Sequence, residues 1–342
     1  MLEFERPYRN ILVATDFSKA AAAALETAAW TARRWQAKLT VVHVVRSVLD
    51  SIAVIGYGAD WEPTLQDLTR LQKQLCDDAE ERLETLLAPL RGGEYEIQGE
   101  VCVGRPFEEI VHVAEKRECD LVIAGTRGLS AVRRILVGST ATKLARVCPC
   151  PVWISRADHA NGLRSILVPL DFSETSQKAL AAGVDLALST GAELHLLHAY
   201  DTEDLHGLLP QSEETKAELA YYRRRSRRAA LEQLQQSLAR VAGDRSIETT
   251  NHVAQGAAWK VISSAARRLN ADLIVMGSVG RRGVSGLLIG NTAERVLHTA
   301  DSSVLVVKPD EFETPVWHSA AAESRRQETH EKGHVEMAGG RH

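Results

Sequence analysis

Two glycine-rich segments, one in each half of the chain, have the residue types and the spacing to hold a polyanion. Each consists of Gly-x-x-Gly, nine further residues, and then a glycine followed by Ser or Asn and by Thr. They are Gly125-Thr126-Arg127-Gly128 with Gly138-Ser139-Thr140, and Gly277-Ser278-Val279-Gly280 with Gly290-Asn291-Thr292. A glycine at a strand end permits unusual turns and lets a phosphate approach the main chain. A helix that begins at the second glycine adds unpaired N–H groups and the positive end of its dipole.

Side chains around these glycines could complete an anion site. The hydroxyls of Ser139, Thr140 and Thr292 can donate to phosphate oxygens. Arginines could neutralise charge nearby, namely Arg127, Arg281 or Arg282. The segments are neither a Walker loop, because G-K-[ST] is missing, nor a dinucleotide G-x-G-x-x-G. The alternative is a purely structural role in tight turns and close helix–strand contacts.

An aspartate follows the first apolar stretch of each half, Asp16 in one and Asp171 in the other. Ligands of parallel α/β sheets bind beyond the carboxyl ends of the strands, where these aspartates are expected to lie. A carboxylate there can accept hydrogen bonds from a ribose or an exocyclic amine. The alternative is that it caps the next helix or its turn.

An internal duplication sets the positions of these residues. The segment 11–18 reappears as 166–173, and 120–125 reappears as 272–277. We therefore predict one domain in 1–157, a second in 158–310, and a flexible polar tail in 311–342.

Short apolar runs alternate with helical patterns in each copy. The predicted strands of the first copy are Arg9–Ala14, Lys38–Val45, Glu94–Cys102, Leu121–Gly125 and Val152–Ser155. The segment Ser47–Trp61 is predicted to be a loop, and a helix is predicted from about Pro63 to Leu87. This alternation predicts an α/β fold with parallel sheets and helices on both faces.

Composition excludes several classes of protein. Hydrophobic residues make up 44% and charged residues 25%, and the net charge is −4. We expect neither general nucleic-acid binding nor a membrane segment, because no apolar run is long enough to span a bilayer. The densest basic run, 223–228, is interpreted as a solvated helix face or a subunit contact. The start lacks the pattern of a signal peptide, and we expect a cytoplasmic protein.

The cysteines and histidines give no pattern of a metal site. Five cysteines, all in the first half, favour reduced thiols over a disulfide framework. Cys148-Pro149-Cys150 lacks the usual C-x-x-C spacing, and we interpret it as two small apolar residues before a strand. His195 and His198 should face opposite sides of a strand and so cannot chelate one ion.

Together these motifs resemble the universal stress protein family in its tandem-domain form, and the E-type subgroup in particular. The resemblance covers about Tyr8 to Pro309 and rests on four features. These are the Thr-Asp-Phe-Ser sequence at 15–18, His43-Val44, the two glycine segments, and the Cys-Pro pair before the last strand.

The resemblance implies two open five-stranded Rossmann-like sheets of strand order 3-2-1-4-5, each binding ATP, ADP or AMP, with or without Mg²⁺. It places adenine or ribose at Asp16 and at the backbone of Val44, with Asp171 and Ala199 as their counterparts. Around the phosphates it places Gly125, Arg127, Gly128, Gly138, Ser139 and Thr140, and in the second half Gly277, Gly280, Gly290, Asn291 and Thr292. The second half departs from the pattern at Leu170 and Val279, which contribute no polar group. The resemblance also implies that the last strands, Val152–Ser155 and Val304–Val307, pair the two domains, and that a homodimer could form.

Three functions follow as hypotheses. The first is a nucleotide-dependent regulatory module of the stress response. The second is an interaction scaffold whose sites are empty or differently occupied. The third is an enzyme, either a slow ATPase or a protein that phosphorylates itself at Ser139 or Thr140. Any hydrolysis should be slow, because the sequence shows no dedicated general base and no pair of carboxylates for Mg²⁺.

Overall fold

The computed structural model describes residues 7–55, 64–126, 137–156, 162–200, 213–280, 289–310, 312 and 314–316. Arg127, Gly128, Arg281, Arg282 and nearly all of the predicted tail lie outside these ranges. None of the helices described is both long enough and apolar enough to cross a membrane.

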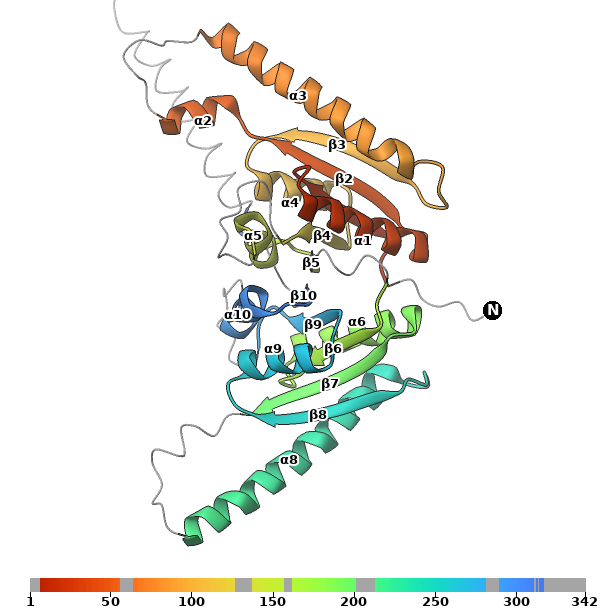
Figure 1. Cartoon of the computed structure of the whole chain (residues 1–342), viewed down its shortest axis with the longest axis vertical. Helices are drawn as coiled ribbons and strands as arrows, with labels where there is room; N and C mark the ends of the chain where they lie inside the picture. The colour runs from red at the N-terminus through yellow and green to blue at the C-terminus, as the bar shows by residue number, and fades with distance from the viewer. Residues whose placement is uncertain are drawn as a thin grey trace, which may run out of the picture.

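A single ten-stranded sheet runs through both halves in the order β3-β2-β1-β4-β5-β10-β9-β6-β7-β8 (Figure 1). The strands of the first half are β1 (Asn10–Thr15), β2 (Lys38–Val45), β3 (Ile97–Val103), β4 (Leu121–Gly125) and β5 (Val152–Ser155). Those of the second half are β6 (Ser165–Pro169), β7 (Glu193–Tyr200), β8 (Thr249–Gln255), β9 (Leu273–Gly277) and β10 (Ser303–Val307). The α/β class and the order 3-2-1-4-5 in each half are thereby confirmed.

The two halves join through their last strands, as predicted. β5 and β10 pair antiparallel, with Val304 opposite Ile154 and Val306 opposite Val152. All other strand pairs in the sheet are parallel. The pairing protects two strands that would otherwise be exposed edges.

Helices cover both faces of the sheet, since the strands are apolar on both sides. One face packs against α1 (Lys19–Trp35), α3 (Leu65–Leu87), α6 (Glu174–Thr190) and α8 (Glu213–Ala242). The other packs against α4 (Pro106–Lys116), α5 (Ser139–Val147), α9 (Ala258–Arg268) and α10 (Asn291–Thr299). At the centre of β1, Ile11, Leu12 and Val13 have no exposed surface.

The loop prediction for Ser47–Trp61 was wrong in part, because Val48–Ile55 forms the helix α2. The backbone N–H of Val48 donates to Gln72 Oε1 on α3 at 2.8 Å, so a contact distant in sequence helps to hold this helix. The glycines and aspartates that suggested a loop lie mostly after residue 55, outside the part that the structure describes.

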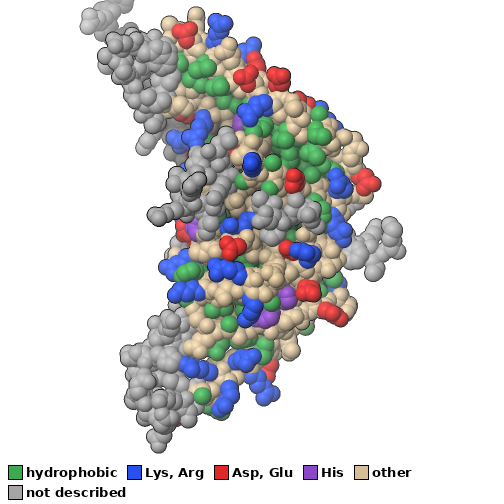
Figure 2. Space-filling view, viewed as in Figure 1, with side chains coloured by type: hydrophobic (Ala, Val, Ile, Leu, Met, Phe, Trp, Pro, Cys, Tyr) green, Lys and Arg blue, Asp and Glu red, His purple; other side chains and the backbone are tan. Residues whose placement is uncertain are grey.

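Charges of both signs are interspersed over the face seen in Figure 2, and Lys and Arg side chains lie at its lower end near α8. The basic run Arg223–Arg228 lies on α8, and Arg224, Arg225, Arg227 and Arg228 are exposed. Within it, Arg228 Nε donates to Glu232 Oε1 at 3.0 Å.

Candidate functional site

A pocket of about 710 Å³ opens where β6, β7 and β9 end and α10 begins. Such a volume is typical of small-molecule sites. All the second-half residues predicted from sequence line it: Asp171, Ala199, Gly277, Gly280, Gly290, Asn291 and Thr292. Apolar residues form another part of the wall, namely Pro169, Leu170, Leu197, Ala258, Ile262 and Met276. The pocket therefore combines an apolar wall with an end formed by glycines and hydroxyl or amide side chains.

Asp171 is held by the turn that leads from β6 to α6. Its Oδ1 accepts hydrogen bonds from the Ser173 N–H at 3.0 Å and from the Ser173 hydroxyl at 2.6 Å. Ser173 in turn caps α6, because its Oγ accepts from the N–H of Ser176 at 3.2 Å. A Cβ added to Gly280 would lie 2.5 Å from Asp171 Oδ2, so the second oxygen faces the glycine backbone. Oδ1 thus accepts hydrogen bonds within the turn, while Oδ2 is directed toward the glycine end of the pocket.

The residue after this aspartate has an unusual backbone conformation. Phe172 lies in the left-handed region with φ 64°, which a phenylalanine rarely adopts. Its ring stacks on His198 with centroids 4.7 Å apart, and His198 Nδ1 lies 2.7 Å from the carbonyl oxygen of Leu170. His198 thus contacts the residues before and after Asp171, and so helps to hold this turn in place.

The first half repeats this arrangement. Phe17 has φ 61° and its ring packs against His43 in a tilted arrangement, with centroids 4.5 Å apart; His43 Nδ1 lies 2.9 Å from the carbonyl oxygen of Thr15. Asp16 Oδ1 accepts from the N–H of Ser18 at 3.1 Å. Burial lowers the pKa of His43, although the hydrogen bond to Thr15 opposes this shift, so the ring is neutral at neutral pH. A neutral imidazole that contacts a carbonyl must carry its proton on Nδ1.

The N-terminus of α10 faces the pocket without a side-chain cap. Gly290 is the N-cap residue and has no side chain to cap the helix, in contrast to Ser173 of α6, and no cap hydrogen bond is seen within the described ranges. The Gly290 N–H donates to the carbonyl oxygen of Ser278 at 2.7 Å, which holds the helix start against the end of β9. The first turn of a helix has backbone N–H groups without partners inside the helix, so this end can bind an anion.

Ser278 is a pocket residue that the sequence analysis quoted but did not assign. It is fully buried, and its hydroxyl has no hydrogen-bond partner among the residues described. A buried hydroxyl without a partner is costly, and a ligand with acceptor oxygens would satisfy it. The signal in the sequence was its place directly after Gly277, where the first half has Thr126.

Gly125 and Gly277 are required because other atoms approach them closely, and not because the chain makes a left-handed turn there. A Cβ on Gly125 would lie 2.5 Å from the carbonyl oxygen of Ala20, and one on Gly277 would lie 3.0 Å from Thr175 Cγ2. Neither glycine has a positive φ. Gly125 and Gly277 thus have the structural role that the sequence left open as an alternative, whereas Gly280 is required next to Asp171.

The first-half residues occupy matching positions as far as the structure describes them. Gly138 is the N-cap of α5 and donates to the carbonyl oxygen of Thr126 at 2.5 Å. Ser139 and Thr140 form the first turn of α5, and Val44 lies near the carboxyl end of β2. Arg82 from α3 lies over the Phe17 ring, 4.1 Å from its centroid.

Comparisons with known proteins agree with this architecture. Residues 7–156 and 162–308 each match the universal stress protein family. A universal stress protein of Mycobacterium tuberculosis, Rv2005c, is 29% identical over 310 residues, which cover 89% of this chain and 98% of that protein. Universal stress protein E of Escherichia coli is 29% identical over 220 residues, 62% of this chain and 68% of that protein.

A solved structure of similar fold is a universal stress protein from Archaeoglobus fulgidus. It has a TM-score of 0.60 and 22% identity, and the alignment covers 87% of this chain and 98% of that one.

Proposed function

Because the chain belongs to the universal stress protein family, we propose that it binds an adenine nucleotide at the carboxyl edge of its sheet and acts as a nucleotide-dependent regulatory module. The relatives with the same two-domain extent are named as stress proteins, which supports the broader role. The nucleotide itself is proposed from the chemistry of the pocket.

The observation that carries the proposal is the uncapped start of α10 beside the buried Ser278 hydroxyl. Both are donors for an anion, and both face one pocket of about 710 Å³. Asn291 and Thr292 add an amide and a hydroxyl at the same end. This donor set fits the oxygens of a phosphate chain.

The opposite wall suits a nucleoside. Ile262 and Met276 offer apolar contacts to a base, and Asp171, next to Gly280, offers a carboxylate that can accept hydrogen bonds from a ribose. Asp171 is the only carboxylate among the lining residues described, and its Oδ1 is already used in the turn. The arrangement supports binding rather than rapid hydrolysis, for which a base or paired Mg²⁺ ligands would be needed.

Isothermal titration of the full chain with ATP and Mg²⁺ tests the proposal. Replacing Thr292 by Val removes one hydroxyl from the pocket, while the side chain keeps nearly the same size. The loss of a hydrogen bond to a charged phosphate costs about 1.5–3 kcal/mol, so the second-half affinity should fall about 10- to 100-fold. Thr85→Val makes the same change on the exposed face of α3, where the Thr85 hydroxyl donates to the Glu81 carbonyl oxygen of the same helix, and should leave binding unchanged.

Because two sites are proposed, the titration is fitted with two dissociation constants. Thr292→Val should raise the dissociation constant of one site and leave the other unchanged. Absence of binding in the wild-type chain, with no nucleotide retained through purification, would instead favour the interaction scaffold.

A further inference from the structure

Outside the pocket, two thiols lie close together where α5 leads into β5. Cys148 follows the last residue of α5, and its N–H donates to the carbonyl oxygen of Leu144. The Sγ atoms of Cys148 and Cys150 are 3.5 Å apart, within hydrogen-bond distance. Cys148 has no exposed surface, whereas Cys150 is partly exposed. To form a bond, the two sulfurs would have to approach from 3.5 Å to about 2 Å, and the partly exposed Cys150 can meet a solute.

The surroundings favour a thiolate on Cys148, whereas the hydrogen bond to Cys148 and burial raise the pKa of Cys150. The hydrogen bond from Cys150 lowers the pKa of Cys148 against the effect of burial, and the nearby Lys308 ammonium lowers it further. Lys308 comes from the second half, and its Nζ donates to the carbonyl oxygens of Ala145 at 2.6 Å and Arg146 at 2.9 Å. A thiolate is the reactive form of cysteine, so a buried cation beside a dithiol promotes oxidation.

We propose that Cys148 and Cys150 are a redox site that forms a reversible disulfide on reaction with a hydroperoxide. This departs from the interpretation of these residues as apolar fillers, because the 3.5 Å contact and Lys308 are visible only in the folded chain.

The chemistry balances in two steps. The Cys150 proton first passes to the Cys148 thiolate, and the Cys150 sulfur attacks the peroxide; the O–O bond breaks and an S–O bond forms. The alkoxide takes the proton from Cys148 and leaves as an alcohol, which makes Cys148 a thiolate again. This thiolate attacks the sulfenic acid of Cys150 and forms the S–S bond, and the expelled hydroxide takes a proton from solvent and leaves as water. Overall the dithiol loses two electrons and two protons, and the hydroperoxide is reduced to an alcohol and water.

A bridge across a single residue closes a very short loop. Such a loop removes little entropy from the unfolded chain, so this disulfide would contribute little to the free energy of unfolding. Thiol reductants should reopen it by exchange.

Cys119 is the nearest competitor. It is close enough to affect the charge of both cysteines, but burial raises its own pKa to about 12, so it remains a thiol.

The test treats the reduced full chain with hydrogen peroxide, unfolds it, blocks free thiols with an alkylating agent, and digests it with trypsin. Cleavage after Arg146 and Arg156 releases a peptide, residues 147–156, that contains both cysteines. The proposal predicts that this peptide carries no alkyl groups and is lighter by two hydrogen atoms. Treatment with a dithiol before alkylation should restore two alkyl groups.

The controls are single serine variants. Cys148→Ser should leave Cys150 as a sulfenic acid that a dimedone probe traps, and Cys102→Ser, outside the pair, should form the bridge as the wild type does. The proposal fails if the wild-type peptide takes up two alkyl groups after peroxide, if its sulfurs go directly to sulfinic acids, or if the bridge joins Cys119 instead. Because the decisive readout uses the wild type, a variant that does not fold would not obscure the result.

Discussion

At the residue scale, Phe17 and Phe172 hold the aspartate turns in a conformation that is costly for a side chain with a Cβ. The left-handed region costs about 1–2 kcal/mol for such a residue. Each ring recovers stability by packing against a histidine, His43 or His198. Backbone strain of this kind is typical of functional sites, and here it fixes the direction of Asp16 and Asp171.

Replacing Phe172 separates the two effects. Phe172→Ala loses the stacking but keeps the strained backbone, and should reduce the free energy of unfolding by about 2–4 kcal/mol. Phe172→Gly loses the same stacking but relieves the strain, so it should be less damaging than Ala by about 1 kcal/mol. Urea unfolding of both variants measures the difference.

Most substitutions to glycine destabilise more than those to alanine, so this order is diagnostic. If Gly proved equal to or worse than Ala, the strain at this position would have no energetic consequence.

Some of these residue roles could be predicted from the sequence and others could not. Asp171 and the second-half glycines could be proposed as site residues because their types repeat at fixed spacing, and the structure places them around one pocket. The bracing role of His198 depends on strand pairing between β6 and β7, and the missing partner of Ser278 depends on burial. Neither property is visible in a run of residue types. The sequence placed Gly125 at a phosphate site, and that role stays a prediction; its close approach to the Ala20 carbonyl on α1 depends on the fold and could not be predicted.

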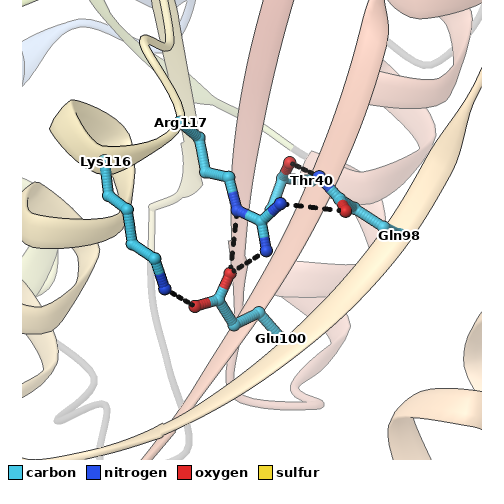
Figure 3. Close-up of polar contacts among 5 residues, drawn as sticks. All are labelled: Thr40, Gln98, Glu100, Lys116 and Arg117. Atoms are coloured by element: carbon cyan, nitrogen blue, oxygen red, sulfur yellow. Dashed lines mark hydrogen bonds and ion pairs between the residues drawn. The ribbon is translucent and has the colours of Figure 1, made fainter.

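At the element scale, corresponding strands of the two halves have different polar partners. In the first half Glu100 on β3 accepts from Arg117 Nη2 at 2.8 Å and from Lys116 at 3.4 Å, and Arg117 continues the network to Gln98 and Thr40 (Figure 3). The pKa of Glu100 is lowered by these cations despite its burial.

The matching positions in the second half carry two histidines. By strand register, His195 on β7 stands where Thr40 stands, and His252 on β8 where Glu100 stands. His252 Nε2 lies 3.5 Å from His195 Nδ1, and Glu193 lies 3.7 Å from the other nitrogen of His195. Burial lowers the pKa of both rings, and for His252 the neighbouring His195 and Arg268 lower it further.

The histidine pair predicts a pH dependence of stability. Below about pH 6.5 the histidines of the unfolded chain take up protons. In the folded chain the lowered pKa values keep both rings neutral to lower pH, so the unfolded state binds more protons. The free energy of unfolding should therefore fall as the pH drops below about 6.5. His252→Gln should flatten this slope between about pH 5 and pH 6.5, as measured by urea unfolding at several pH values.

His298→Gln, on α10 outside the pair, is the control and should keep the wild-type slope. An unchanged slope in His252→Gln would show that the pair contributes nothing to the acid sensitivity.

At the scale of the whole molecule, the antiparallel pairing of β5 with β10 turns two domains into one continuous sheet. An ion pair between Arg146 on α5 and Glu294 on α10 also joins the halves, as do the bonds from Lys308 to the end of α5. The duplication could be predicted because the same segments recur along the chain, and the pairing of the last strands was implied by the family resemblance. The cluster of Lys308 with Cys148 and Cys150 could not, because its members are far apart in sequence and meet only through that pairing.

The duplication gives one chain two proposed sites, and both proposals rest on a single physical idea. The backbone N–H groups at the starts of α5 and α10 would bind the oxygens of a phosphate chain. A nucleoside without phosphates would lack these contacts, so its binding should be weaker.

The most direct test is the order of affinities of ATP, AMP and adenosine for the full chain, measured by isothermal titration under one set of conditions. If the helix starts hold the phosphates, ATP should bind most tightly, AMP less tightly and adenosine at least about tenfold more weakly than ATP, a difference of about 1.4 kcal/mol. Equal affinities for ATP and adenosine, or no binding of any of the three, would contradict the account.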